Sequence, residues 1–309
     1  MVIVINPHAH GGTGLKRWRA IAPGVRERWP YECIIPETAD EARTQVAEAA
    51  SRGTGVIIAG GGDGCVNLVL NTIMDPETDA PRWSVAIGAL GLGSSNDFHK
   101  PRLPDNDVGG VPIKLDPLLG GLVDVGRADW LDPDGEPHTS YFLLNSSLGA
   151  TAKGNYAFNQ ASGVQAWLKK VNTNLAIQWG SAAAILQFAN VPARMEIDGH
   201  PVEIPAISNL GVIKRVYFCG GMRYDTPVRD DDGYFDVNLL AGMDRVGFLT
   251  AISAISAGKF LGQPGARHWR AKHVRVIPEQ PTVLELDGEV YPVKEVSWRV
   301  IPKAVRVCG

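Results

Sequence analysis

Residues 60–71, GGGDGCVNLVLN, form a glycine-rich loop and the start of a helix directly after the apolar run GVIIA. Glycines let backbone N–H groups approach a phosphate, and a helix that begins after such a loop adds a partly positive N-terminus. Asp63 could bind Mg²⁺ there, or it could simply cap the helix of an ordinary strand-to-helix turn. The loop matches neither common phosphate-binding motif and contains no lysine. Taken alone, it leaves the phosphate loop and the plain turn equally open.

Two more polar, glycine-rich loops follow apolar strands, at residues 6–14 (NPHAHGGTG) and 88–101 (GALGLGSSNDFHKP). The second offers backbone and serine donors with the side chains of Asn96 and Asp97, although alone it favours a helix N-cap region. Ligands of open α/β sheets bind beyond the carboxyl ends of the strands, so three such loops together outline a nucleotide site. The histidines of the H-x-H pair in the first loop have no evident third ligand, so no metal is expected there.

Two acidic segments lie in the second half of the chain. RDDDGYFDV (229–237) clusters three acids before a glycine, which is typical of a hard-cation site or of an exposed acidic turn. In TVLELDGEVYPV (282–293), Asp-Gly between two strand-like runs predicts a hairpin. Spacing alone places Asp287 and Glu289 on the surface of that turn.

These segments together resemble the catalytic family of the diacylglycerol kinases, in particular its soluble bacterial lipid kinases. NPHAHGG resembles the family's N-P-x-S-G loop, GGGDGCVN its G-G-D-G-T-x-N-E signature, and GLGSSNDF its G-T-x-N-D-F motif. TPVRDDDGYFDV is similar to P-x-A-x-x-D-D-G-x-L-D-V, and LELDGE followed by VIPKAVRV is similar to the closing motifs. Single motifs are weak signals, whereas five in the right order over essentially the whole chain are strong.

The resemblance implies that ATP binds in a cleft between two domains and that a phosphoryl group moves to a lipid hydroxyl. Glu289 takes the place of the proton acceptor with Asp287 beside it, and Asp63 with a catalytic Mg²⁺ would offset phosphate charge. Asn96 and Asp97 are the expected substrate-binding residues. The residues expected to bind the nucleotide are Asn6, Pro7, His8, Gly11, Gly12, Thr38, Gly61, Gly62, Asp63, Gly64, Cys65, Val66, Asn67 and Ser94.

The resemblance also implies a second, structural Mg²⁺ in the second domain. It would be held by Asp232 and by the backbone carbonyls of Arg229 and Tyr234.

Three positions depart from the family pattern. Cys65 replaces the signature threonine, Leu68 replaces the glutamate of N-E, and HKP (99–101) replaces small and basic residues. The leading hypothesis is an ATP- and Mg²⁺-dependent kinase of a diacylglycerol-like or sphingoid lipid. One alternative is a nucleotide-binding relative that has lost turnover and regulates or binds. The other is an NAD kinase, which shares the GGDG loop but fits the DDG and DGE segments less well.

The composition fits a soluble two-domain protein. The chain has 309 residues, 45% of them hydrophobic, and its net charge of −3 gives no reason to expect nucleic acid. Four cysteines without paired spacing are typical of reduced thiols in the cytoplasm. The N-terminus does not resemble a signal peptide, and polar residues interrupt the most apolar stretch, 174–193. We therefore expect a cytoplasmic protein that meets membranes peripherally, with a homodimer as an open alternative.

The elements that must position these residues change in character along the chain. Apolar strands at 2–5, 31–36, 55–59 and 83–90 alternate with helices at 15–29, 38–53 and 65–74, which predicts an open, mainly parallel sheet covered on both faces. Thr38, with Glu41 three residues later, predicts the N-cap of the second helix.

Strand-like segments punctuated by Gly, Asp and Pro follow, so we expect a mainly antiparallel β domain over 123–301, with helical insertions near 160–190 and 244–260. Those insertions could form an apolar groove for acyl chains. The resemblance implies an NAD kinase- and diacylglycerol kinase-like fold in which residues 302–309 return to the α/β domain of residues 1–122.

Overall fold

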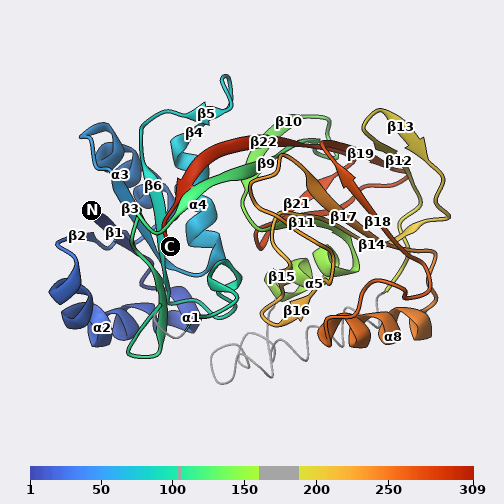
Figure 1. Ribbon diagram of the computed structural model, residues 1–309. Helices are drawn as coiled ribbons and strands as arrows, with labels where there is room; N and C mark the ends of the chain where they lie inside the picture. The colour runs from blue at the N-terminus through green and yellow to red at the C-terminus, as the bar shows by residue number, and fades with distance from the viewer. Residues whose placement is uncertain (104–105, 160–187) are drawn as a thin grey trace. The chain divides into compact units, whose positions relative to one another are not determined.

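The computed structural model describes residues 1–103, 106–159 and 188–309 (Figure 1). The chain divides into two compact units. Unit 1 consists of Met1–Val123 and Lys303–Gly309, and unit 2 consists of Asp124–Pro302. Two strands, β9 (Gly121–Leu131) and β22 (Glu295–Val307), have residues in both units.

Unit 1 is built on a mainly parallel sheet in the order β6-β3-β1-β2. The last residues of β22 add a further parallel strand beside β6, with Val307 opposite Ile87. Near-continuous apolar runs form the central strands because both faces of the sheet are covered. The bounds are β1 (Val2–Ile5), β2 (Glu32–Ile34), β3 (Val56–Gly61), β4 (Met74–Asp75), β5 (Ala80–Pro81), β6 (Ala86–Gly91), β7 (Asp107–Val108) and β8 (Val111–Lys114). The predicted α/β class is confirmed.

The helices of unit 1 begin close to the loops of interest. They are α1 (Ala9–Gly12), α2 (Gly14–Arg28), α3 (Ala39–Ser51), α4 (Asp63–Ile73) and the 3₁₀ helix η1 (Asp97–His99). Thr38 is the N-cap of α3 as predicted, since its hydroxyl accepts a hydrogen bond from the Glu41 amide at 3.1 Å. The Glu41 carboxylate, however, accepts from the amide of Glu37 at 2.8 Å rather than from that of Thr38.

Unit 2 is mainly antiparallel, as predicted. One sheet has the order β18-β17-β14-β11-β20-β21, and β13, β12, β19 and β22 pair in a second antiparallel series. The bounds are β10 (Pro137–Phe142), β11 (Asn145–Gly149), β12 (Ala193–Ile197), β13 (His200–Val202), β14 (Ile207–Ile213), β15 (Tyr217–Phe218), β16 (Met222–Arg223), β17 (Phe235–Ala241), β18 (Ala266–Ala271), β19 (His273–Pro278), β20 (Thr282–Leu286) and β21 (Glu289–Val293).

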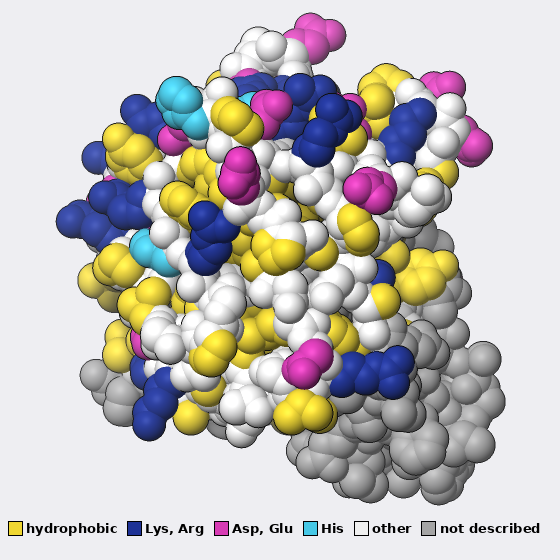
Figure 2. Space-filling model, turned by 90° about the vertical axis from the view of Figure 1, so that its right-hand side faces the viewer, with side chains coloured by type: hydrophobic (Ala, Val, Ile, Leu, Met, Phe, Trp, Pro, Cys, Tyr) yellow, Lys and Arg dark blue, Asp and Glu magenta, His cyan; other side chains and the backbone are white. Residues whose placement is uncertain are grey.

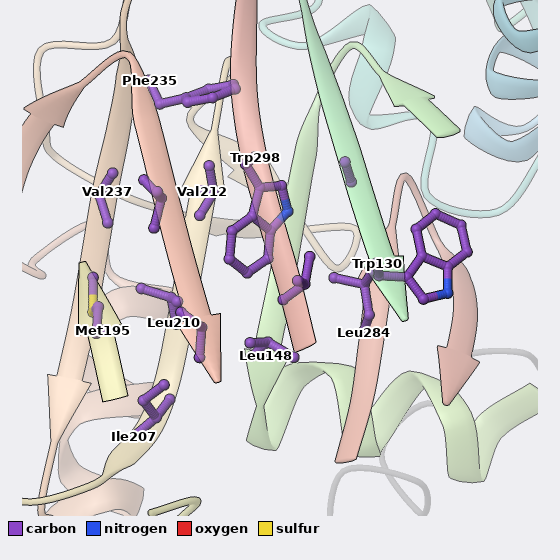
Figure 3. Packing of buried hydrophobic residues seen from close by; sticks show 14 of the residues in the cluster. Trp130, Leu148, Met195, Ile207, Leu210, Val212, Phe235, Val237, Leu284 and Trp298 are labelled. Atoms are coloured by element: carbon purple, nitrogen blue, oxygen red, sulfur yellow. The ribbon is translucent and has the colours of Figure 1, made fainter. Parts of the chain in front are cut away.

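The core of unit 2 is a layer of large apolar side chains contributed by both series of strands. Figure 3 shows Trp298 of β22, Val212 of β14 and Leu284 of β20 within this layer. Trp298 is fully buried, and its indole N–H donates to the Ser146 hydroxyl at 2.8 Å. Each such fully buried side chain contributes about 1.5–3 kcal/mol, so this layer gives the acidic and hairpin loops of the unit a rigid support.

Two helices of unit 2 are described, α5 (Ala150–Asn159) and α8 (Arg245–Ser256). Asp244 caps α8 by accepting from the Gly247 amide at 2.7 Å, in agreement with the helix expected near 244–260. Most of the insertion expected near 160–190 and residues 174–187 of the apolar stretch 174–193 lie outside the described residues. Within the described ranges, no helix has the length and apolarity needed to cross a membrane.

Figure 2 shows one face of the molecule with its side chains coloured by type. On the part of this face that the structure describes, apolar side chains gather toward the middle, and Lys and Arg side chains lie along the upper and left edges with Asp and Glu side chains among them.

Candidate functional site

Three glycine-rich loops leave the carboxyl ends of neighbouring strands in unit 1. Since β6, β3 and β1 lie side by side and parallel, their carboxyl ends fall on the same edge of the sheet. The loops are loop 1 after β1 (residues 6–14), loop 2 after β3 (60–67) and loop 3 after β6 (91–101).

Side chains from loop 1 contact both other loops. The Asn6 amide nitrogen donates to the Cys65 sulfur of loop 2 at 3.4 Å. The His10 ring nitrogen Nδ1 lies 3.2 Å from the Ser94 hydroxyl of loop 3. The fold therefore brings Asn6 close to Cys65 and His10 close to Ser94, although the residues of these pairs lie up to 84 positions apart in the sequence.

Loops 2 and 3 pack backbone against backbone. The Gly93 amide donates to the carbonyl of Gly61 at 3.0 Å. A side chain at Gly93 would collide with the Cα of Gly62, and one at Gly61 would collide with the Cys65 sulfur. Glycine is thus required at position 93 by the approach of loop 2, and at position 61 by the Cys65 side chain of the same loop, whether or not a phosphate is bound.

Asp63 joins loop 2 to loop 3. Its carboxylate oxygens accept hydrogen bonds from the Asp97 amide at 3.0 Å and the Phe98 amide at 2.9 Å. Gly62 occupies the N-cap of α4, and Asp63 is the first residue of the helix. The interpretation of Asp63 as the cap of its own helix is therefore wrong, because its carboxylate satisfies the amides at the start of η1 instead.

The two residues expected to bind substrate, Asn96 and Asp97, are buried within loop 3. The Asn96 side chain donates to the carbonyls of Gly91 and Gly93 at 3.0 Å each and accepts from the Gly93 amide at 3.1 Å. Its backbone is left-handed, with φ 50°. The Asp97 carboxylate pairs with the Lys100 ammonium at 2.6 Å. These contacts fold the loop, and any contact with substrate remains a prediction.

Arg17 of α2 is a residue that the sequence patterns did not single out. Its guanidinium donates to the carbonyls of Leu92 at 2.6 Å and Gly93 at 3.2 Å, which places positive charge against loop 3. Burial and the nearby Arg102 lower the pKa of Arg17, and burial and Arg17 lower the pKa of His10. The segment LKRWRA holds three basic residues, and nothing in their spacing marks this one.

A cavity of about 230 Å³ opens beside loops 1 and 2 within unit 1. Of the predicted nucleotide-binding residues, Asn6, His8, Thr38 and Cys65 line it. Pockets for whole drug-sized ligands span about 300–1,000 Å³, so this one has room for part of a ligand such as a nucleobase. Its other lining residues are Val4, Pro36, Glu37, Ala39, Ala42, Ala59, Leu68 and Val69, which make it largely apolar.

The remaining predicted nucleotide-binding residues lie in loops 1 to 3 but outside this cavity. The glycines of loop 1, Gly11 and Gly12, are exposed and have positive φ values of 66° and 89°. Val66 and Asn67 are buried in α4, where the Asn67 side-chain oxygen accepts from Asn71 at 3.0 Å. The others are Pro7 of loop 1, Gly61, Gly62 and Gly64 of loop 2, and Ser94 of loop 3.

In unit 2, the predicted hairpin forms between β20 and β21, with Asp287 and Gly288 as its two turn residues. Both have positive φ, 47° and 95°, as a type I′ turn requires. The Asp287 carboxylate accepts hydrogen bonds from the amides of residues 143, 144 and 145 at 2.9, 2.9 and 3.1 Å. The side chain is 4% exposed, so the expectation of a surface position is wrong for Asp287. It holds for Glu289, which is exposed.

The predicted metal ligands, Asp232 and the carbonyls of Arg229 and Tyr234, do come together in unit 2. They surround the ammonium of Lys214, which was not predicted. Among the residues that the structure describes, no group of three or more His, Cys, Asp or Glu side chains is arranged to hold a metal ion.

Comparison with known proteins matches both parts of the chain. The diacylglycerol kinase catalytic domain matches residues 1–109, and the YegS C-terminal NAD kinase beta sandwich-like domain matches residues 149–309. A Stenotrophomonas maltophilia protein named probable lipid kinase YegS-like is 24% identical over 270 residues, which cover 86% of this chain and 82% of that protein.

A Staphylococcus haemolyticus protein named diacylglycerol kinase is 23% identical over 315 residues, which cover 99% of this chain and 87% of that protein. Among solved structures, a diacylglycerol kinase from Bacillus anthracis aligns with a TM-score of 0.67 and 18% identity. That alignment covers 99% of this chain and 95% of the other, which shows a shared fold.

Proposed function

We propose that this chain, which belongs to the lipid kinase family of YegS and diacylglycerol kinase, transfers the γ-phosphoryl group of ATP to a lipid hydroxyl. The proposed acceptor is a diacylglycerol-like or sphingoid lipid. The observation that carries the proposal is the junction of loops 1, 2 and 3 at one edge of the unit 1 sheet. Phosphoryl transfer depends on positioning and charge neutralisation more than on covalent chemistry. A rigid junction of glycine-rich backbone provides that positioning.

Unit 1 is the proposed ATP-binding unit. The largely apolar cavity beside loops 1 and 2 would take the base, and the backbone amides of the loops would take the phosphates. Arg17 adds a guanidinium charge against loop 3. Neither Cys65 nor Leu68 opposes this assignment, since both line the cavity and an apolar lining suits a base.

The residues present fit an Mg²⁺ ion that travels with ATP. Such an ion needs only one or two protein carboxylates in addition to the phosphates, and Asp63 is the proposed carboxylate. A carboxylate oxygen can accept more than one bond, so the amide contacts of Asp63 are compatible with this role. When bound, the ion would neutralise phosphate charge.

Glu289 is the proposed proton acceptor. The alternative in the same hairpin, Asp287, already satisfies three backbone amides, and ionised carboxylates held in this way are poor bases. Glu289 has an exposed carboxylate on β21 that could approach a substrate hydroxyl. We therefore assign a structural role in the hairpin to Asp287 and the role of proton acceptor to Glu289.

The lipid acceptor would bring the protein to a membrane surface from the cytoplasm. Exposed apolar side chains support such contact: on α8, Val246 is 71% exposed and Leu249, three residues on, is 42% exposed. Residues three apart share a helix face, so these two could enter the lipid interface together.

ATP consumption measured with diacylglycerol, sphingosine, ceramide and NAD tests the proposed function. We expect ATP-dependent phosphorylation of one of the lipids. Measurable ATP binding without phosphorylation of any lipid would contradict the kinase assignment and favour a relative without turnover. Phosphorylation of NAD alone would favour an NAD kinase.

Replacement of Cys65 by threonine should raise turnover by about threefold to tenfold. The Asn6 amide donates to a sulfur at 3.4 Å, and sulfur is a weak acceptor, whereas a hydroxyl bond contributes about 0.5–1.5 kcal/mol. Steady-state kinetics with the best lipid acceptor measures the gain. Cys65→Val is the matched control, because valine has the shape of threonine without its hydroxyl. Equal activity of the two variants would show that the missing hydroxyl is no deficit.

A further inference from the structure

The side chain of Lys214 is fully buried in unit 2, directly after β14. Its ammonium nitrogen donates to the Asp124 carboxylate at 2.8 Å and to the backbone carbonyls of Arg229 and Tyr234 at 2.8 and 2.7 Å. An ammonium has three N–H donors, so these three contacts satisfy it completely. The Asp232 carboxylate lies at 3.5 Å as a fourth oxygen.

The carboxylate and carbonyl oxygens around Lys214 are of the kind that bind a hard cation. Carboxylates and backbone carbonyls are the usual ligands of Mg²⁺ and Ca²⁺, at about 2.0–2.6 Å. Here the Lys214 nitrogen already lies within 2.8 Å of three such oxygens. A metal ion that used the same oxygens would have to occupy the position of the ammonium, so the residues do not fit a divalent ion while Lys214 is in place.

Charged side chains of both signs lie around the ammonium. Asp124 and Asp232 supply two negative charges, and Lys214 and Arg270 supply two positive ones, with Arg270 paired to the second oxygen of Asp232. Burial tends to raise the pKa of Asp232, but the Tyr234 amide, Lys214 and Arg270 outweigh it and hold the pKa below its ordinary value. A divalent ion beside Asp232 would therefore be repelled by the Lys214 and Arg270 cations that already contact this carboxylate.

The acidic turn itself is folded around this centre. The Gly233 amide donates to the Asp124 carboxylate at 2.7 Å, and the Tyr234 amide donates to Asp232 at 3.1 Å. Gly233 has a φ of 75°, which a glycine adopts without strain. Asp124 and Asp232 therefore stabilise the turn by accepting hydrogen bonds from its backbone amides, and Lys214, which follows β14, contacts both carboxylates.

We propose that Lys214 is a built-in substitute for a divalent cation, so that the acidic turn of unit 2 is ordered by an internal ammonium and needs no metal. A tethered charge is present in every folded molecule, whereas an ion stabilises the fold only in proportion to its concentration. The stability of unit 2 is thus independent of metal supply. This inference concerns unit 2 alone and does not rest on the proposed kinase activity.

Thermal unfolding without nucleotide, in EDTA and in millimolar Mg²⁺ or Ca²⁺, tests this inference. The wild-type Tm should differ by less than about 1 °C between these conditions. Lys214→Ala should lower the Tm in EDTA by more than about 5 °C, because the buried Asp124 carboxylate loses its cationic partner. Metal should restore much of that loss, since the vacated space keeps its oxygens. A wild-type Tm that rises by several degrees with metal would overturn the proposal.

Two further variants identify the source of any metal effect. Lys272→Ala removes an exposed lysine of the same unit, 5.1 Å from the Tyr234 ring, and should show neither the loss nor the rescue. Asp232→Asn combined with Lys214→Ala should abolish the rescue. A Lys214→Ala protein that folds equally well with and without metal would contradict the proposed substitution.

If Lys214→Ala does not fold under any of these conditions, Mn²⁺ binding to the wild-type chain tests the proposal instead. Without nucleotide, we expect no ion retained in unit 2. One bound Mn²⁺ per chain that persists in Asp63→Asn and is lost in Asp232→Asn would overturn the proposal.

Discussion

Replacement of Glu289 by glutamine is expected to lower kcat for lipid phosphorylation by about 10²- to 10⁴-fold, the usual contribution of a general base. Glutamine keeps the size and polarity of the side chain but cannot accept the proton of the attacking hydroxyl. Because the Glu289 side chain is exposed, its replacement should leave the Tm and the affinity for ATP unchanged. Steady-state kinetics, ATP binding and thermal unfolding measure these three quantities.

Glu279→Gln is the matched control, since Glu279 is an exposed glutamate in the same unit, between β19 and β20. It should retain wild-type turnover. A fully active Glu289→Gln would remove Glu289 from the mechanism without contradicting the lipid kinase assignment. A large fall in Tm would instead assign a structural role to this carboxylate.

Replacement of Asp63 by asparagine should weaken both stability and nucleotide binding. The carboxylate accepts from two backbone amides, and asparagine would turn an N–H₂ group toward one of those donors. A buried donor without its acceptor costs about 1–3 kcal/mol. If that cost falls on the junction of loops 2 and 3, ATP affinity should fall by about tenfold to a hundredfold, since 1.4 kcal/mol corresponds to a factor of ten.

ATP affinity measured with and without Mg²⁺ separates two roles of Asp63. If the carboxylate only positions loop 3, the affinity falls in both conditions; if it also holds the ion, the Mg²⁺-dependent part is lost in addition. Asp40→Asn is the control, because Asp40 is an exposed acid at the start of α3 and should matter little. Unchanged ATP affinity and Tm in Asp63→Asn would contradict the positioning role.

The sequence predicted the architecture of unit 1 because its signals are local. Apolar runs of strand length alternate with amphipathic helices, and Thr38 caps α3 through a contact only three residues away. The same holds for the hairpin at Asp287, where two turn residues need left-handed backbone. Five motifs in the order typical of one family then identified the chain's lipid kinase family.

The predictions that failed concern acids whose partners are distant in sequence. Asp63 had been a candidate cap of its own helix, yet its carboxylate bonds amides 34 and 35 residues away. Asp287 was expected at the surface, yet it holds backbone amides more than 140 residues away. Spacing shows that a carboxylate stands in a turn, but not which donors the folded chain brings to it.

The sequence by itself determined the elements, the glycine loops at the strand ends and the chain's family, because periodicity, turn chemistry and motif order are properties of neighbouring residues. Only the tertiary structure decided which groups surround each charged side chain. Lys214 looks like an ordinary lysine after a strand, and in the fold it stands among the two carbonyls and the Asp232 carboxylate that were expected to hold a metal, beside the Asp124 carboxylate, which was not predicted. A buried charge is stable only beside opposite charge, and that neighbourhood exists only once distant strands have packed.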